Sequence, residues 1–321
     1  MIIREFDHYD KIIISYSGGK DSTACALLMK EYGIPAHKVW LWHQSIDGRL
    51  HTEKKFFDWP STEGYVSKFS EYTGMALDFQ WRHYGFYGEL HRENELTENV
   101  SYTFGNTLTT LKTTGGKETT RLKWPAKTAS LKTRWCSAYL KIDVAARALS
   151  NHPALKNKRI LFITGERRQE SSARSKYQEA ELHRTNSKTR LVHHWRPVID
   201  LSERDIWDAM EKHRIQPHPA YYLGFPRLSC RSCIFYSKDH WATLNKVAPE
   251  VTKMIIEKEQ EFGFTLDNKF TLDELIRQGE SLLKDENREF INLANNPYIE
   301  NILTNNWILP AGAFGSGGGS L

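Results

Sequence analysis

The segment that decides the fold of this chain is Lys11-Ile12-Ile13-Ile14-Ser15-Tyr16-Ser17-Gly18-Gly19-Lys20-Asp21-Ser22. Its apolar first half predicts a buried strand, and residues 22–32 predict a helix. The two glycines between them allow several backbone N–H groups to point at one ligand. The helix N-terminus adds partial positive charge, and Lys20 adds a full charge. The segment therefore predicts a phosphate-binding loop.

The spacing of this loop separates it from two common nucleotide motifs. A Walker A motif requires a glycine where this chain has Ile14. A dinucleotide fingerprint requires a third glycine where this chain has Asp21-Ser22-Thr23. The alternative interpretation is a glycine turn beside a chance Lys-Asp pair.

The rest of the chain predicts an α/β fold with a parallel twisted sheet and helices on both faces. Short apolar runs alternate with helical stretches, the runs at 11–16, 39–43, 76–81, 159–164 and 191–195 and the helices at 22–32, 61–72 and 138–149. Ligands of such sheets bind beyond the carboxyl ends of the strands. Both the glycine loop and the segment that begins at Thr164 follow predicted strands.

Three regions are expected. Residues 1–200 form the nucleotide-binding α/β domain, with a basic, Thr-rich insertion near 100–134. Residues 201–310 form a C-terminal region with a C-x-x-C motif and helices. Residues 311–321, which include five glycines, are expected to be a flexible tail.

Composition places the protein in a broad class. The chain has 321 residues, 40% of them hydrophobic, which is enough for a substantial core. It has no apolar run near 18 residues and no apolar leader, so we expect a cytoplasmic protein without membrane contact. Four cysteines favour metal or catalytic use over a disulfide framework. The net charge of +5 permits nucleic-acid binding without requiring it.

Positive charge is concentrated between Lys112 and Arg134, which holds seven basic residues and one acid. This segment reads as a long exposed loop. It can be a solvated insertion, a mobile cover over a nucleotide, or a track for a polynucleotide backbone.

A second charged segment, Thr164 to Arg174, contains three arginines beside acids and serines. Guanidinium forks suit phosphate or sulfonate oxygens. The alternative is a solvated helix start with internal ion pairs. Its position at a strand end, like that of the glycine loop, favours a role in binding.

Three cysteines are candidate metal ligands: Cys136, Cys230 and Cys233. Three thiolates can hold a four-iron cluster with one open iron, and with a histidine they can hold zinc. Redox dithiol chemistry and coincidence stay as alternatives. Cys25, inside the first helix, is expected to be a packing residue. His218 can be a ligand, a substrate contact or a loop residue that forms hydrogen bonds.

The motifs follow one another in the order S-G-G-K-D-S, R-W-C-S, T-G-E-R-x-x-E-S-x-A-R, W-R-P, H-P-A-Y and C-x-x-C. Over about residues 10 to 245, this order resembles the phosphoadenosine phosphosulfate (PAPS) reductase-like family of PP-loop ATP pyrophosphatases. The resemblance implies an adenine nucleotide α-hydrolase fold. The nucleotide-binding residues that we expect are Ser15, Ser17, Gly18, Gly19, Lys20, Asp21, Ser22, Gly165, Glu166, Arg167 and Arg174.

The family implies an enzyme that cleaves ATP, bound with Mg²⁺, between its α- and β-phosphates. We expect Lys20, Asp21 and Arg167 to be catalytic. The cysteines resemble those of iron–sulfur thiolation enzymes and of DNA phosphorothioation. The expected function is therefore adenylation of an acceptor for sulfur transfer, with a 4Fe–4S cluster or zinc. A nucleic acid is one candidate acceptor, and a sulfur-donor protein is a candidate partner.

Two alternatives remain open. One is a PAPS reductase or sulfotransferase-like enzyme that acts on a sulfonucleotide. True PAPS reductases carry a catalytic cysteine near the C-terminus, and no cysteine follows Cys233 in this sequence. The other is a nucleotide-binding regulator with a structural metal and no turnover.

Overall fold

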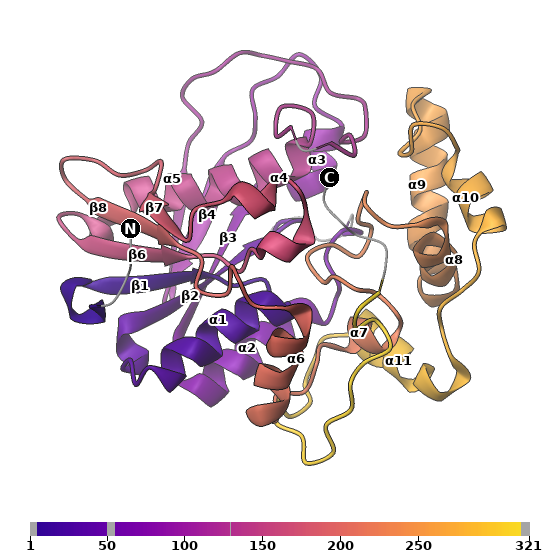
Figure 1. Ribbon diagram of the computed structural model, residues 1–321. Coiled ribbons are helices and arrows are strands. Elements are labelled where there is room, and N and C mark those ends of the chain that lie inside the picture. The colour runs from indigo at the N-terminus through magenta and orange to yellow at the C-terminus, as the bar shows by residue number, and fades with distance from the viewer. Residues whose placement is uncertain (1–4, 50–54, 129, 316–321) are drawn as a thin grey trace.

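The computed structural model describes residues 5–49, 55–128 and 130–315, and an eight-stranded sheet lies at its centre (Figure 1). The strands lie in the order β5-β4-β3-β2-β1-β6-β8-β7. Their bounds are β1 (Lys11–Ser15), β2 (Val39–Ser45), β3 (Ala76–Arg82), β4 (Val100–Phe104), β5 (Thr107–Leu111), β6 (Arg159–Ile163), β7 (Ala180–Leu182) and β8 (Leu191–Trp195).

The five central strands are parallel, and the outer strands β4, β5 and β7 are antiparallel to their neighbours. Strand β1 lies between β2 and β6, so the chain winds outward from β1 in both directions. Such a switch point leaves a crevice beyond the carboxyl ends of the two strands. The glycine loop leaves β1 at this point.

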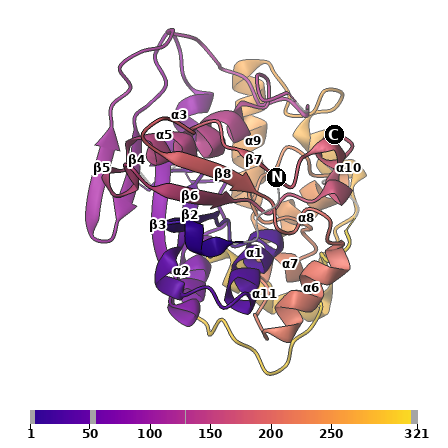
Figure 2. The ribbon, with the colours of Figure 1, turned by 60° about the vertical axis from the view of Figure 1, so that its left-hand side comes forward.

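Helices cover both faces of the sheet (Figures 1 and 2). Helices α1 (Lys20–Glu31) and α2 (Thr62–Thr73) pack on one face, and α5 (Asp143–Asn151) packs on the other. Because successive strand residues point to opposite faces, Ile12 and Ile14 join the core with α1, while Ile13 joins the core with α5. Two shorter helices, α3 (Gly85–Leu90) and α4 (Trp135–Ser137), lie on the α5 side, and a π turn over residues 138–142 joins α4 to α5.

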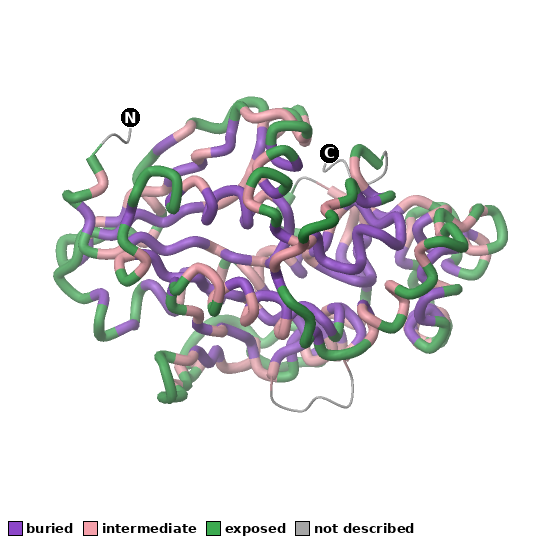
Figure 3. Tube along the Cα trace, turned by 90° about the horizontal axis from the view of Figure 1, so that it is seen from below, coloured by how far each residue is buried: buried purple, intermediate pink, exposed green. Residues whose placement is uncertain are grey.

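The C-terminal part is helical and lies beside the sheet. Its helices are α6 (Glu203–Lys212), α7 (Pro219–Tyr222), α8 (Lys238–Val247), α9 (Pro249–Phe262), α10 (Leu272–Gln278) and α11 (Glu289–Asn295). Capping boxes fix the starts of α6 and α8 at Ser202 and Ser237. Figure 3 shows that buried residues run from the sheet into this region.

The predicted fold class is confirmed, because the sheet is mostly parallel and covered on both faces. The sequence analysis missed β4, β5 and β7, and the first two occupy the start of the predicted insertion near 100–134. Of the predicted tail, residues 311–315 are described, and Gly312 N–H donates to the Tyr221 carbonyl at 2.7 Å. The remaining tail residues lie outside the described part. Within the described residues, no helix is long and apolar enough to span a membrane.

Candidate functional site

The glycine loop has a backbone that only small residues tolerate. Gly18 has a φ of +76°, and a Cβ atom there would lie 2.9 Å from Val66 Cγ1. Gly19 is the N-cap residue of α1, so the N–H groups of the first helical turn have no partner within the helix, and that of Lys20 donates to the Tyr221 hydroxyl. The strand, loop and helix thus have the arrangement that favours an anion at this end of the sheet.

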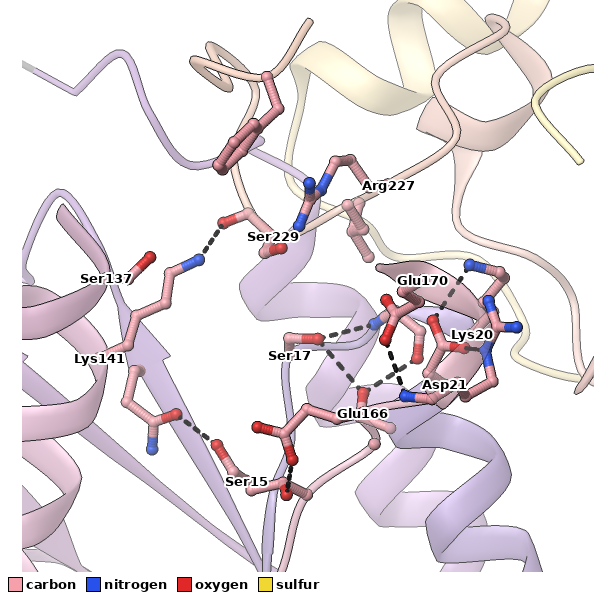
Figure 4. A pocket seen from close by; sticks show the side chains of 18 of the residues that line it. Ser15, Ser17, Lys20, Asp21, Ser137, Lys141, Glu166, Glu170, Arg227 and Ser229 are labelled. Carbon is pink, nitrogen blue, oxygen red and sulfur yellow. Dashed lines mark hydrogen bonds and ion pairs between the residues drawn. The ribbon is translucent and has the colours of Figure 1, made fainter. Parts of the chain in front are cut away.

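Four charged side chains meet at the start of α1, and Figure 4 shows two of them, Lys20 and Asp21, side by side. Lys20 Nζ lies 3.1 Å from Asp21 Oδ2 and 3.6 Å from Glu203 Oε1. Arg167 Nε lies 2.6 Å from Asp21 Oδ1, and its Nη2 lies 4.0 Å from Glu203 Oε2. Burial opposes the charge of Lys20, but Asp21 and Glu203 outweigh it and raise the Lys20 pKa. The three predicted catalytic residues therefore lie together.

Gly165 explains how the segment after β6 reaches the loop. A Cβ atom at Gly165 would lie 2.8 Å from the Asp21 carbonyl carbon and 3.0 Å from Ser22 N. Only glycine permits this approach without a shift of backbone. The contact brings Arg167 beside Asp21. Burial opposes ionisation of Asp21, but Lys20 and Arg167 lower its pKa, so it stays an anion.

Glu166 is held by the residues that directly follow β6 and β8. Arg196 Nε donates to Glu166 Oε2 at 3.0 Å, and Thr164 also donates to this carboxylate. Arg196 in turn donates to Glu181 Oε1 at 2.7 Å. Arg196 belongs to the W-R-P motif, so this motif orients Glu166 from behind the cavity.

A cavity of about 760 Å³ opens beyond the carboxyl ends of β1 and β6. Of the predicted nucleotide-binding residues, those that line it are Ser15, Ser17, Gly19, Lys20, Asp21, Ser22, Gly165, Glu166, Arg167 and Arg174. Gly18 shapes the loop without lining the cavity. Most of the predicted site therefore surrounds one space.

Glu203 and Tyr221 also line the cavity, and the sequence analysis did not assign either of them to the site. Tyr221 appeared only as part of the H-P-A-Y motif, and Glu203 belongs to none of the motifs described above. The Tyr221 hydroxyl accepts the Lys20 backbone N–H at 3.0 Å, and burial raises its pKa to about 12. The H-P-A-Y motif was the signal for Tyr221. No signal in the sequence joined Glu203 to Lys20.

The three candidate cysteine ligands are buried and lie in one neighbourhood beside the cavity. A hydrogen bond from Cys230 lowers the pKa of Cys233, and Arg227 adds to this effect against burial. Lys141 Nζ lies 3.5 Å from Cys230 Sγ. Cys25 is fully buried in the core, which agrees with a packing role.

The donor chemistry of these cysteines suits a cluster, because all three are thiols and positive side chains lie beside them. However, no group of three or more His, Cys, Asp or Glu side chains in the described ranges has an arrangement that could hold a metal ion. The three cysteines therefore match an iron–sulfur ligand set in residue type and in lying near one another, but not in a geometry that could hold a metal ion.

His218 forms hydrogen bonds within its own loop and to α2. Its Nδ1 accepts the Ala220 N–H at 3.2 Å, so Nε2 carries the proton and donates to Ser61 Oγ at 3.0 Å. The side chain is fully buried, and burial lowers its pKa to about 3. Of the three roles considered for His218, this geometry favours the loop residue.

Ion pairs with other parts of the fold anchor some residues of the basic segment after β5. Arg121 Nε lies 2.9 Å from the buried carboxylate of Glu89, and Lys127 Nζ lies 2.7 Å from Asp267 Oδ2. Lys117, Lys123 and Lys132 are exposed. The segment thus combines anchoring ion pairs with solvent-facing lysines.

Part of this chain is similar to a known protein family. Residues 88–235 match the phosphoadenosine phosphosulfate reductase domain. This span includes the three cysteines and the segment at Gly165, and it begins after the glycine loop. A protein of Escherichia phage 186, described as an uncharacterized 37.8 kDa protein in the gpa 5′ region, is 29% identical over 259 residues. The match covers 77% of this chain and 74% of the phage protein.

The adenosine 5′-phosphosulfate reductase of Burkholderia cepacia is 26% identical over 98 residues. That match covers 30% of this chain and only 35% of the enzyme. Candida glabrata FMN adenylyltransferase, solved with FMN and the ATP analogue AMPCPP, aligns with a TM-score of 0.41 and 11% identity over 93% of this chain and 79% of that one. Residues 88–235 are therefore similar to a phosphoadenosine phosphosulfate reductase domain, and the resemblance that the order of the motifs predicted is confirmed.

Proposed function

We propose that this protein is an ATP pyrophosphatase that adenylates an acceptor for sulfur transfer, in the manner of nucleic-acid thiolation or phosphorothioation. One observation carries the proposal. Two strand ends bring Lys20 and Arg167 to the same carboxylate, Asp21, at the entrance of α1 and beside a cavity of about 760 Å³. Such a site suits the triphosphate of a nucleotide.

In the proposed reaction, the β- and γ-phosphates of ATP bind the glycine loop together with Mg²⁺. An acceptor oxygen attacks the α-phosphorus, and the bond from that phosphorus to the pyrophosphate oxygen breaks. Lys20, Arg167 and the N–H groups of the first turn of α1 stabilise the negative charge on the departing pyrophosphate. The acceptor leaves this step as an adenylate, which a sulfur nucleophile can then displace with release of AMP.

We propose that Cys136, Cys230 and Cys233 would hold the cofactor, a 4Fe–4S cluster, with zinc as the alternative. When bound, a cluster with three protein ligands supplies an iron that is open to a sulfur ligand. Lys141 and Arg227 lower the cost of placing thiolates at this buried position.

The second candidate function is that of an enzyme whose substrate is a sulfonucleotide. It is supported by the similarity to adenosine 5′-phosphosulfate reductases, which spans about a third of those enzymes. In that case the nucleotide would be the sulfur source, and a partner protein would supply the thiol. The main proposal requires release of pyrophosphate from ATP, and the reaction on a sulfonucleotide does not, so this product distinguishes the two functions.

The products of ATP cleavage test the main proposal. We expect AMP and pyrophosphate, and ADP with orthophosphate as the main products would contradict it. Because Lys20 is buried, Lys20→Met preserves the aliphatic stem while it removes the charge. This variant should lose about 100-fold or more in kcat. Lys30→Ala, an exposed position on the same helix, should change kcat by less than about twofold.

Metal analysis of anaerobically purified protein tests the cofactor. We expect bound iron, and each of Cys136→Ser, Cys230→Ser and Cys233→Ser should remove most of it. Cys25→Ser is the matched control and should leave the iron content unchanged. Protein with neither iron nor zinc would refute the cofactor, and protein with zinc alone would replace the cluster with a structural metal.

A further inference from the structure

A second cavity, of about 490 Å³, borders the π turn over residues 138–142. Residues in and beside this turn divide between the two cavities. Ser137 and Ile142 line the large cavity of the nucleotide site. Ala138, Tyr139 and Asp143 line the second cavity. The turn is therefore a wall that the two cavities share. Turns of this kind are rare in helices and occur frequently at functional sites.

Positive side chains from three segments line the second cavity. Lys112 follows β5, Arg147 lies on α5, and Arg184 follows β7. In the described part of the chain, the side chain of Lys112 has no partner, and Arg147 and Arg184 donate hydrogen bonds only to neutral oxygens. Asp143 is the carboxylate of the lining, and its Oδ2 lies 2.6 Å from Nη2 of the buried Arg82. Because Arg82 balances Asp143, the three lining cations leave an excess of positive charge.

Hydrogen bonds fix the rim of this cavity before any ligand arrives. Arg147 Nη2 donates to the Leu111 and Lys112 carbonyl oxygens at 3.1 and 2.9 Å. Its Nη1 donates to Thr113 Oγ1 at 3.1 Å, and the Thr113 N–H donates to Asn99 Oδ1 at 2.8 Å. The first residues of the basic segment are therefore bound to α5 and to the residue that precedes β4. Groups that are fixed in advance bind a ligand at a smaller entropic cost.

We propose that the second cavity binds a backbone phosphate of a single-stranded nucleic acid, which is the acceptor in the proposed function. Guanidinium and ammonium groups match phosphate oxygens, and Thr114, exposed in the lining, adds a hydroxyl donor. The inference rests on the proposed function, for which it names the class of acceptor and the place where that acceptor is held.

Two features favour a polymer over a small phosphorylated compound. The π turn separates the second cavity from the nucleotide, so a small molecule bound there would not meet the α-phosphorus. A nucleic acid can occupy both cavities, because one nucleotide binds the second cavity while a neighbouring one crosses the turn. The basic segment also continues from Lys112 to the exposed lysines Lys117, Lys123 and Lys132. A double helix is too wide for this cavity, since its major groove alone is about 12 Å across, so the proposal specifies a single strand.

Fluorescence anisotropy of labelled single-stranded DNA and RNA of about 15 nucleotides, at about 0.15 M salt, tests the site. The wild type should bind at least one of them. The double variant Lys112→Gln with Arg184→Gln should lose about tenfold or more in affinity. Its log–log salt slope should be smaller by about 0.7 for each phosphate contact removed. The control, Lys253→Gln with Arg277→Gln, removes the same charges from exposed positions of α9 and α10 and should bind within about twofold of the wild type.

A second pair of variants separates the cavity from the general charge of the basic segment. Thr114→Glu places a carboxylate in the lining, where the phosphate would bind. This variant should lose about tenfold or more in affinity, because like charges would meet in the cavity. Thr107→Glu makes the same change at an exposed position of β5 that does not line the cavity, and it should bind like the wild type.

A wild type that binds neither oligonucleotide, or cavity variants that bind as tightly as their controls, would overturn the proposal. Equal affinity of the wild type for deoxythymidine monophosphate and for the oligonucleotide would also overturn it, because the cavity would then be a site for small phosphorylated compounds. These titrations contain no ATP. A failure to cleave ATP to AMP would therefore refute the proposed function and leave the result on the second cavity intact.

Discussion

At the scale of single residues, the site depends on one close backbone approach. Gly165 touches the backbone at Asp21, and this contact sets the place of Arg167. A side chain at Gly165 would push the two strand ends apart. Gly165→Ala should therefore lower the free energy of unfolding by about 1–3 kcal/mol and weaken ATP binding. Urea unfolding and nucleotide titration measure the two effects.

The control is Gly115→Ala. A Cβ atom at Gly115 would meet nothing within 4 Å, so this variant should fold and bind ATP like the wild type. Equal stability of the two alanine variants would show that the contact at Asp21 does not constrain the site.

The nucleotide-binding residues that were predicted and that line the cavity lie in two short segments at strand ends, which is why local patterns could identify them. Lys20 could be named from its charge in the glycine loop and Arg167 from its charged segment at a strand end, whereas the role expected of Asp21 came from the resemblance to the family. Tyr221 and Glu203 could not be assigned to the site, because they approach Lys20 from far along the chain, Tyr221 from 201 positions away. Such contacts depend on how the C-terminal helices pack, which local patterns do not determine.

At the scale of elements, a buried pair of carboxylates joins the loop after β2 to the C-x-x-C segment. Asp47 Oδ2 accepts the N–H groups of Phe57 and Asp58 at 2.7 and 2.8 Å. Asp58 Oδ2 accepts those of Ile46 and Asp47 at 2.7 and 2.9 Å. Burial, and then the charge of Asp58, raise the pKa of Asp47 to about 7, while Arg231 of the C-x-x-C segment opposes the rise.

A raised carboxyl pKa destabilises the fold as pH increases. Between about pH 4 and pH 7 the folded state keeps a proton that the unfolded chain has lost, so stability should fall across this window and level off above it. Burial raises the pKa of Asp58 as well. Of the charged neighbours that face Asp58, His43 lowers its pKa and Glu63 raises it. In Asp47→Asn, the loss in the free energy of unfolding across this pH window should be smaller than in the wild type by on the order of 1 kcal/mol.

Urea unfolding at several pH values measures this slope. Asp273→Asn, at an exposed position of helix α10, should keep the wild-type slope. An Asp47→Asn protein whose stability falls as steeply as that of the wild type would contradict the assignment of the proton to this pair.

Elements were predictable where apolar runs are long and buried. The strands near Ile13, Leu41 and Leu161 were found for that reason. Strands β5 and β7 were missed because they are short and most of their residues are exposed, and β4, which pairs with β5, was missed with them. These outer strands owe their conformation to pairing with a neighbour, which a local hydrophobic pattern does not reveal.

At the scale of the whole molecule, the basic segment after β5 gives the test of a nucleic-acid acceptor. Arg121 and Lys127 form ion pairs with Glu89 and Asp267, so their removal would disturb the fold as well as the charge. The exposed lysines, Lys117, Lys123 and Lys132, can be changed without that effect. They are therefore the residues to alter.

If these three lysines follow a polynucleotide backbone, binding of labelled DNA or RNA should weaken as salt increases. Each phosphate contact that is removed should reduce the log–log salt slope by about 0.7 to 0.9. The triple alanine variant should thus lose nucleic-acid affinity and salt dependence while its ATP affinity stays the same. A triple variant of exposed lysines on the C-terminal helices and the loop after α9, at Lys246, Lys253 and Lys269, controls for net charge. Equal binding by both variants would remove this segment as a nucleic-acid track, and a small molecule would become the favoured acceptor.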